Sequence, residues 1–217
     1  MTLAIFDLDN TLLHGDSDHA WGEFIANLGI VDSKSYREKN DAFYDDYCRG
    51  ALDVFAYQRF VLQPLAGLSM AELARWHEQF MREKIEPIIL PKAQALIDSH
   101  RAQRHTLMII TATNSFITAP IAKRLGIDTL IATTPEQKNG VYTGDIVGVP
   151  CYREGKVERL NVWLAENEAT LNGSYFYSDS HNDLPLLQRV DNPVAVDADD
   201  TLRKYAEDNG WRILSLR

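Results

Sequence analysis

Short apolar runs rich in strand-forming residues recur along the chain and alternate with segments of helical spacing. The first run, LAIFDL, begins at residue 3 and ends in acidic and polar residues, as is typical of a buried parallel strand with a functional carboxyl end. Four later runs share this character, namely 106–111, 129–134, 174–179 and 192–197, and helical spacing occupies 92–104, 114–125 and 153–168. This alternation predicts a doubly wound α/β fold with a parallel, Rossmann-like sheet.

Residues 15–86 follow a different pattern, in which the strand signal disappears. Trp21, Phe24, Ile25 and Leu28 recur at offsets of three and four, which indicates a helix with one apolar face. We therefore predict an all-helical cap at 15–86, inserted into an α/β core formed by 1–14 and 87–217. The aromatic residues that are concentrated there are expected to fill the core of the insert, and a few of them to line a substrate pocket.

Two connecting segments have patterns of their own. EPIILP at 86–91 brackets an apolar triplet with prolines and is the expected return linker from the insert to the core. GVYTGDIVGVP at 140–150 alternates strand-forming residues around Thr-Gly-Asp, which predicts a β-hairpin within this segment.

The chain is acidic, with 31 Asp and Glu residues against 22 Lys and Arg residues and a formal net charge of −9. This balance argues against a general affinity for nucleic acid or anionic membrane, so we expect neither as a partner. Cys48 and Cys151 are about a hundred positions apart, which favours neither a disulfide framework nor a zinc site. With no signal-peptide pattern and no apolar run of membrane-spanning length, a cytoplasmic location is expected.

Two acidic clusters follow apolar runs, at the edge of a parallel sheet where ligands bind. The first is Asp7-Leu8-Asp9-Asn10-Thr11, for which an aspartate-rich helix-capping turn is the alternative interpretation. The second is Ser178-Asp179-Ser180-His181-Asn182-Asp183, at the end of another predicted strand. Converging carboxylates repel one another unless a cation lies among them, and hard oxygen ligands suit Mg²⁺. Charge balance therefore predicts a magnesium site.

Two further residues complete a pattern that suits phosphate. Thr111 ends an apolar run, and Ala112, Thr113 and Asn114 open a predicted helix, whose N-terminal backbone N–H groups are a natural place for phosphoryl oxygens. Lys156 begins another predicted helix and can supply a localised positive charge. Taken alone, Thr111 is ordinarily interpreted as a structural residue and Lys156 as a solvated surface charge. Only their combination with the two acidic clusters indicates a phosphate site.

In this order and at these separations, the D-x-D-x-T motif, Thr111, Lys156 and the carboxylates Asp179 and Asp183 resemble the haloacid dehalogenase-like phosphatases over the whole chain. The chain is most similar to the branch that contains phosphoserine phosphatase, which has a helical cap after the first motif and a Thr-Gly-Asp hairpin before the Lys. It departs from that branch at Ser178, where the branch has Gly, and at Thr111-Ala112-Thr113, where Ser-Gly-Gly is common. These residues leave less room beside the phosphate and bear on the choice of substrate.

The resemblance implies a phosphomonoester hydrolase that works through an aspartyl phosphate on Asp7, with Asp9 as general acid and base. Thr111 and Lys156 would bind the phosphoryl oxygens. Mg²⁺ would be held by the carboxylates of Asp7 and Asp179 and the backbone carbonyl of Asp9, and supported by Asn182 and Asp183.

The expected substrate is a small phosphorylated metabolite. Relatives that act on phosphoserine imply Asp16, nine positions after the nucleophile, as a ligand for a substrate amine, and Arg59 as the cap arginine. The chain also resembles a group of bacterial capped phosphatases, some assigned to histidinol phosphate, whose amine and imidazole suit an aromatic-rich cap. His14 and His181 flank the predicted site, either as contacts of the leaving group or as bystanders. Histidinol phosphate leads the candidates, ahead of phosphoserine.

Three alternatives remain at this stage. A phosphate-accepting signalling receiver also clusters aspartates, a Thr and a Lys, but it predicts no helical insert and gives Asp9 no duty. A phosphotransferase would pass the phosphoryl group from Asp7 to an alcohol instead of water. A binding protein with a relic site is disfavoured because the required residues are all present. The oligomeric state is not predicted.

Overall fold

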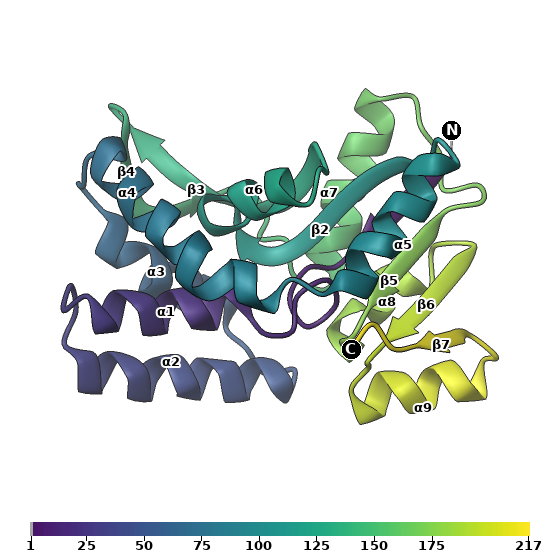
Figure 1. Cartoon of the computed structure of the whole chain (residues 1–217), viewed down its shortest axis with the longest axis horizontal. Helices are drawn as coiled ribbons and strands as arrows, with labels where there is room; N and C mark the ends of the chain where they lie inside the picture. Colours follow the sequence, from purple (N-terminus) through teal and green to yellow (C-terminus); the bar gives the residue numbers. More distant parts are fainter. Residues whose placement is uncertain (1) are drawn as a thin grey trace.

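A single seven-stranded sheet organises the computed structural model, which describes residues 2–217 (Figure 1). The strands are β1 (Leu3–Phe6), β2 (Thr106–Asn114), β3 (Thr129–Lys138), β4 (Val141–Val147), β5 (Tyr175–Ser178), β6 (Asn192–Val196) and β7 (Arg212–Leu214), and their order is β4-β3-β2-β1-β5-β6-β7. Every neighbouring pair is parallel except β3 and β4. The predicted doubly wound parallel fold is therefore confirmed, with β1 at the centre.

Helices cover both faces of this sheet. They are α5 (Pro91–Ala102), α6 (Ser115–Arg124), α7 (Glu154–Glu166), α8 (Leu184–Leu187) and α9 (Asp200–Asp208), with a short turn η4 (His181–Asp183) before α8. The helix α9 and the strand β7 were not anticipated from the sequence, because their apolar positions are few and the strand has only three residues. None of the helices in the described chain is long and apolar enough to cross a membrane.

The two faces of β1 belong to two separate hydrophobic clusters. Ala4 and Phe6 pack in the cluster that contains side chains of α5 and α6, whereas Leu3 and Ile5 pack with side chains of α7, α8 and α9. All four residues are fully buried. Because side chains alternate along an extended strand, the next residue, Asp7, continues the face that is covered by α7.

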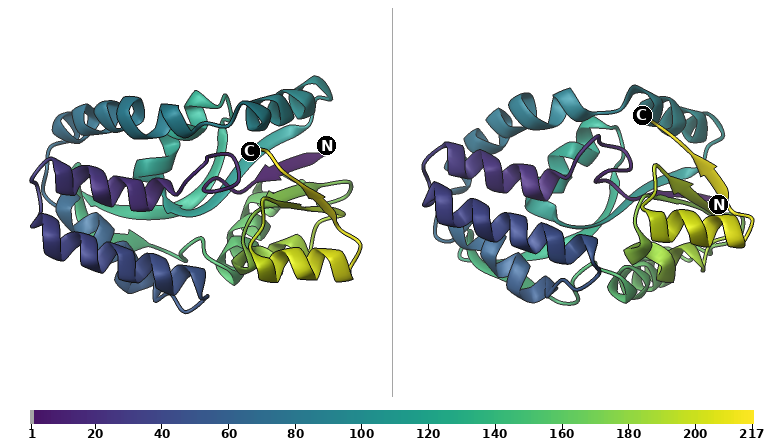
Figure 2. Two further views of the ribbon diagram at one scale, coloured as in Figure 1. Left: turned by 60° about the horizontal axis from the view of Figure 1, so that its bottom comes forward. Right: turned by 90° about the horizontal axis from the view of Figure 1, so that it is seen from below.

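Between β1 and β2 the chain forms helices at the end of the molecule opposite β5–β7 (Figure 1). These are α1 (Ser17–Asn27), α2 (Ser33–Cys48), α3 (Val54–Leu62) and α4 (Met70–Phe80), with short turns η1 (Gln63–Leu65), η2 (Met81–Ile85) and η3 (Glu86–Ile88). Figure 2 shows α1 and α2 side by side. Each of the four helices follows an Asp or Ser whose side chain accepts a backbone N–H of the first turn, which is typical of an N-cap.

A two-residue bridge between Leu13 and Ile89 joins the ends of this helical segment, close to the predicted boundaries at 14 and 87. The 86–91 linker contains the turn η3 and this bridge residue. That residues 15–86 are a domain of their own stays a prediction.

The hairpin lies elsewhere than predicted. Thr143-Gly144-Asp145 is inside the continuous strand β4, whose antiparallel partner is β3, which extends to Lys138. The turn is Asn139-Gly140, with φ values of 54° and 79°, and Asn-Gly is the favoured pair where both turn residues need positive φ. The prediction of a hairpin confined to 140–150 was therefore wrong, because the turn signal lies at the start of that segment.

Gly155 fixes the start of α7 against the preceding loop. A Cβ at this position would lie 2.1 Å from the carbonyl oxygen of Pro150, too close for any real contact. We expect Gly155→Ala to lower the free energy of unfolding by about 2–4 kcal/mol, because backbone has to move to relieve the clash. Urea unfolding followed by circular dichroism measures this change.

Asn161→Ala, an exposed position on the same helix, is the matched control and is expected to change stability by no more than about 0.5 kcal/mol. Equal stabilities for Gly155→Ala and the control would show that the contact with Pro150 does not constrain the helix.

Candidate active site

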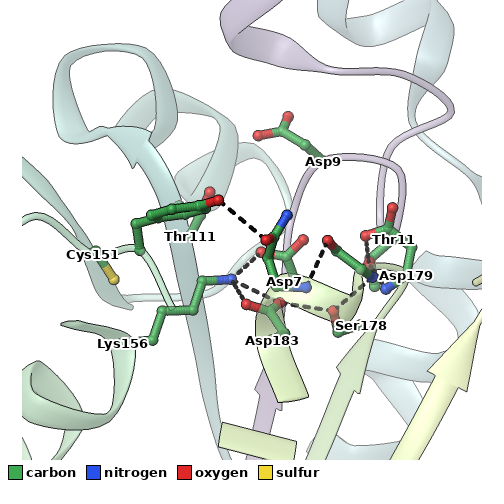
Figure 3. Close-up of polar contacts among 12 residues, drawn as sticks. Asp7, Asp9, Thr11, Thr111, Cys151, Lys156, Ser178, Asp179 and Asp183 are labelled. Atoms are coloured by element: carbon green, nitrogen blue, oxygen red, sulfur yellow. Dashed lines mark hydrogen bonds and ion pairs between the residues drawn. The ribbon is translucent and has the colours of Figure 1, made fainter. Parts of the chain in front are cut away.

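Lys156, in the first turn of α7, lies between two carboxylates from different segments (Figure 3). Its Nζ atom is 2.8 Å from Asp7 Oδ1 and 2.7 Å from Asp183 Oδ1. All three side chains are almost fully buried. Nζ also lies 5.8 Å from the centre of the Phe176 ring, on the same face of the sheet. Lys156 therefore holds the end of β1 to the loop that follows β5.

The carboxyl ends of β1 and β5 converge, as the sequence predicted for its two acidic clusters. The Asp7 N–H donates to the Tyr177 carbonyl at 2.9 Å. Thr11 Oγ1 donates to Asp179 Oδ1 and accepts from the Asp179 N–H, both at 3.1 Å. Ser178 Oγ donates to Asp183 Oδ2 at 2.7 Å, which shows that the Ser in place of the related branch's Gly has a bond of its own.

Asp9 is turned away from this group and towards the helical segment (Figure 3). The Ser17 N–H donates to Asp9 Oδ1 at 2.7 Å, and Thr113 Oγ1 donates to Asp9 Oδ2 at 2.8 Å. Both carboxylate oxygens are therefore engaged, one by the start of α1 and one by the carboxyl end of β2. The sequence did not reveal this bond of Thr113, because it joins residues about a hundred positions apart.

Burial and mutual repulsion dominate the electrostatics of the site. Burial raises the pKa of Asp7 to about 7, although Lys156 opposes the shift. Burial, followed by the charges of Asp7 and Asp183, raises the pKa of Asp179 well above its usual range. Burial alone would lower the pKa of Lys156, but Asp183 and Asp7 outweigh it and the net shift is upward. Lys156 thus pairs with Asp7 and Asp183, and the nearby carboxylate of Asp179 has no ion-pair partner among the described residues.

The donor set suits a divalent cation of the magnesium type. Among residues 2–217, no three carboxylate, imidazole or thiol side chains converge as a complete metal cage. Mg²⁺ does not need one, because it usually keeps several waters and takes one or two carboxylates together with substrate phosphate. Three carboxylates, Asp7, Asp179 and Asp183, lie near a single lysine, and a divalent cation would offset their excess negative charge.

A pocket opens beside this group, between the sheet edge and the helical segment. It contains about 490 Å³ of empty space, part of it open to solvent, and its floor includes Asp7, Asp9, Thr111, Ala112 and Thr113. The helical segment contributes Asp16, Asp18, Tyr44, Tyr47, Leu52, Val54, Tyr57 and Gln58. The pocket therefore joins the predicted reaction centre to the segment that was predicted to select the substrate.

Most of the predicted site residues come together here. Thr111 is buried, and its Oγ1 accepts the Thr113 N–H at 3.3 Å, while the Ala112 carbonyl accepts from Thr133 Oγ1. Asn114 is the N-cap of α6 and is buried behind the pocket lining. Asn182 accepts from the Tyr152 hydroxyl and donates to the Tyr47 carbonyl of α2, each at 3.1 Å.

Asp16 lines the pocket, and its side chain caps α1 by accepting the His19 N–H at 2.8 Å. The structure does not bring Arg59 into the pocket, because the residue faces outward from α3 and lies 3.4 Å from Asp145 of β4. His14 is exposed and is not among the residues that line the pocket. His181 is held by Asp199 at 2.8 Å, outside the pocket lining.

Apart from Asp16, sequence reasoning did not name the residues of the helical segment that line the pocket. Val54, Tyr57 and Gln58 follow the i, i+3, i+4 spacing of one helix face, and Tyr44 and Tyr47 are three residues apart on α2. That spacing was the available signal, but it is also the spacing of ordinary core positions.

A parallel sheet with an aspartate pair at the end of its central strand, a buried lysine and a helical segment over the site is the arrangement expected of an α/β hydrolase with an inserted cap. The model of the haloacid dehalogenase-like hydrolase family matches residues 4–188. The chain therefore belongs to the haloacid dehalogenase-like hydrolases.

Several relatives are similar over nearly the whole chain. A histidinol-phosphatase of Neisseria meningitidis serogroup C is 46% identical over 99% of this chain and 99% of its own. A phosphoserine phosphatase of Mycobacterium tuberculosis is 32% identical over 99% of this chain and 70% of its own.

Solved structures show the same fold. A protein of unknown function from Bordetella pertussis Tohama I is 45% identical, with a TM-score of 0.94 and complete coverage of both chains. A substrate-bound phosphoserine phosphatase is 17% identical, with a TM-score of 0.72 over 100% of this chain and 93% of its own. At that identity the second likeness concerns the fold alone.

The raised pKa of Asp9 predicts a pH dependence of stability. Burial, with the charge of Asp16, raises this pKa to about 7, so the folded protein keeps a proton that the unfolded chain releases above about pH 4. The stabilisation is therefore complete below about pH 4 and lost as the pH rises through about 7. Without Mg²⁺, we expect Asp9→Asn to reduce this decline by on the order of 1 kcal/mol per pH unit, as measured by urea unfolding at several pH values.

Asp128→Asn, at an exposed position, serves as the control and should retain the wild-type slope. Parallel stability curves for Asp9→Asn and the wild type would contradict the shifted pKa of Asp9.

Proposed function

We propose that this phosphatase hydrolyses a small phosphate monoester in two steps, through a phosphoryl group carried on Asp7. The observation that carries the proposal is that the two aspartates of the first motif have different partners and positions. Asp7 is held by Lys156 at the sheet edge, whereas Asp9 is held by Ser17 and Thr113 at the pocket. This arrangement supports the assignment of Asp7 as the nucleophile and Asp9 as the proton carrier.

Asp7 would attack the phosphorus atom, forming a bond from its carboxylate oxygen as the bond to the leaving alcohol breaks. Lys156 keeps the Asp7 carboxylate in place and offsets its negative charge as a phosphate dianion approaches. The Thr111 hydroxyl and the backbone N–H groups at the carboxyl end of β2 can donate to the phosphoryl oxygens. Water then attacks the phosphorus and releases Asp7.

Asp9 would donate a proton to the leaving oxygen in the first step and remove one from water in the second. This dual role requires a carboxyl group that exchanges its proton near neutral pH. Its pKa of about 7 is suited to that role, since burial and the neighbouring Asp16 both favour the protonated form. The bonds from Ser17 and Thr113 hold the side chain in one orientation.

Mg²⁺ would be held by the carboxylates of Asp7 and Asp179 and the backbone carbonyl of Asp9. When bound, it would offset the charge of the phosphate and the nucleophile. Asp183 is bonded to Lys156 and Ser178, and Asn182 to Tyr47 and Tyr152, so these two residues would support the site indirectly.

We expect Asp7→Asn to lower phosphate release by at least about a thousandfold, because an amide cannot form the phosphoryl intermediate. Chelation of Mg²⁺ should abolish wild-type release, and added Mg²⁺ should restore it. A phosphate-release assay measures both effects, with Asp128→Asn as a folded control of full activity. Near-normal turnover of Asp7→Asn would contradict the assignment.

For the substrate, we propose histidinol phosphate ahead of phosphoserine. The relative named histidinol-phosphatase is 46% identical over the length of both chains. The pocket also supports this order, because no Lys, Arg or His occurs among the described residues that line it. The carboxylate of phosphoserine would therefore face carboxylates and tyrosines without a compensating cation.

We expect kcat/KM for histidinol phosphate to exceed that for phosphoserine by at least about tenfold, since the carboxylate of phosphoserine pays an uncompensated desolvation cost. Phosphate release from a panel of small monoesters, each with Mg²⁺, measures the ratio. Adding alcohols as acceptors and analysing the products separates hydrolysis from phosphoryl transfer. A preference for phosphoserine would refute the proposed order.

A further inference from the structure

Asp18 is a buried carboxylate on the pocket wall that the proposed chemistry does not use. It lies in the first turn of α1, is 3% exposed and lines the pocket. Its Oδ1 atom is buried without a hydrogen-bond partner. No basic side chain in the described part of the chain forms an ion pair with it. A buried carboxylate left in this state is costly and calls for a partner.

Gln58, on α3, provides a second, independent observation in the lining of the same pocket. It is 1% exposed, and its Nε2 donates to the Ala112 carbonyl at 3.4 Å. That bond fixes the orientation of the amide, so Oε1 is the remaining group, and it is buried without a partner. Gln58 therefore adds a second unpaired acceptor to the pocket lining.

The remaining polar groups on this wall do not neutralise Asp18. The Asp16 carboxylate caps α1, and the Tyr57 hydroxyl lies beside the Asp18 carboxyl and favours its charged form. Burial, followed by the charges of Asp16 and Asp9, raises the pKa of Asp18 well above its usual range. A cation with several N–H donors would relieve this repulsion and satisfy both unpaired oxygens.

We infer that Asp18 and Gln58 form a specificity subsite for the leaving group, one that selects phosphate esters of alcohols carrying a cationic nitrogen with N–H donors. This inference rests on the proposed function, since it assigns one part of the same substrate. The subsite accepts hydrogen bonds and offers a negative charge, so it favours an ammonium or protonated imidazole group. An ester with a neutral alcohol gains nothing there.

Asp18→Asn tests the subsite, because it keeps the shape of the side chain and removes its charge. We expect kcat/KM for histidinol phosphate to fall by about 10- to 100-fold, mainly through a higher KM, since a charge-assisted hydrogen bond is lost. For p-nitrophenyl phosphate, whose leaving group is neutral until it departs, we expect a change below about twofold. Asp45→Asn, an exposed carboxylate on α2, is the matched control and should change neither value.

Competition supplies a second measurement on the wild type and both variants. Histidinol, which has the amine and imidazole but no phosphate, should inhibit the hydrolysis of p-nitrophenyl phosphate, with an inhibition constant about tenfold weaker in Asp18→Asn. Circular dichroism and thermal unfolding establish that each variant is folded.

The outcomes separate this inference from the proposed function. Equal losses for both esters, or no loss for histidinol phosphate in folded Asp18→Asn, would overturn the subsite while leaving the phosphatase intact. A wild-type protein that shows no preference for histidinol phosphate over p-nitrophenyl phosphate would also overturn the subsite. No release from any ester in the presence of Mg²⁺ would instead overturn the proposed function.

Discussion

The interaction on which the site depends is the contact of one buried ammonium group with two buried carboxylates. Lys156 Nζ lies within 2.8 Å of both Asp7 and Asp183, and so joins the end of β1, the start of α7 and the loop after β5. Desolvating three charges is expensive, and removing any one partner would leave an uncompensated charge in the interior. The arrangement therefore fixes geometry more than it adds stability.

The chain around Lys156 is built to keep it in place. Arg153, just before α7, has a φ of 51°, which is unusual for a residue other than glycine, and Gly155 lies where a side chain would collide with the Pro150 carbonyl. The strained turn and the missing side chain together let the helix begin close to the sheet edge. From this position a lysine in the first turn of the helix reaches the carboxylates. A helix that began farther from the sheet edge would leave the lysine out of reach.

The sequence predicted β1, β2, β3, β5 and β6 and the convergence of the two acidic clusters, because both follow from patterns of neighbouring residues. An apolar run that ends in Asp7 or Asp179 predicts both a strand and the functional residue at its carboxyl end. The segment over the pocket was harder, because successive side chains on a helix differ by about 100° in direction. On α3, Gln58 therefore faces the pocket and its neighbour Arg59 faces Asp145. Residue type alone does not predict which side of the helix faces the pocket.

The last turn of α2 and the loop that follows it contact the core at two places, one beside Lys156 and one beside Asp183. The Gly50 carbonyl accepts from Arg153, beside α7, and the Tyr47 carbonyl accepts from Asn182, next to Asp183, each at 3.1 Å. Any displacement of the helical segment from the sheet would break these two bonds. Such a displacement would therefore remove contacts from Arg153 and Asn182, which are close neighbours in the chain of Lys156 and Asp183.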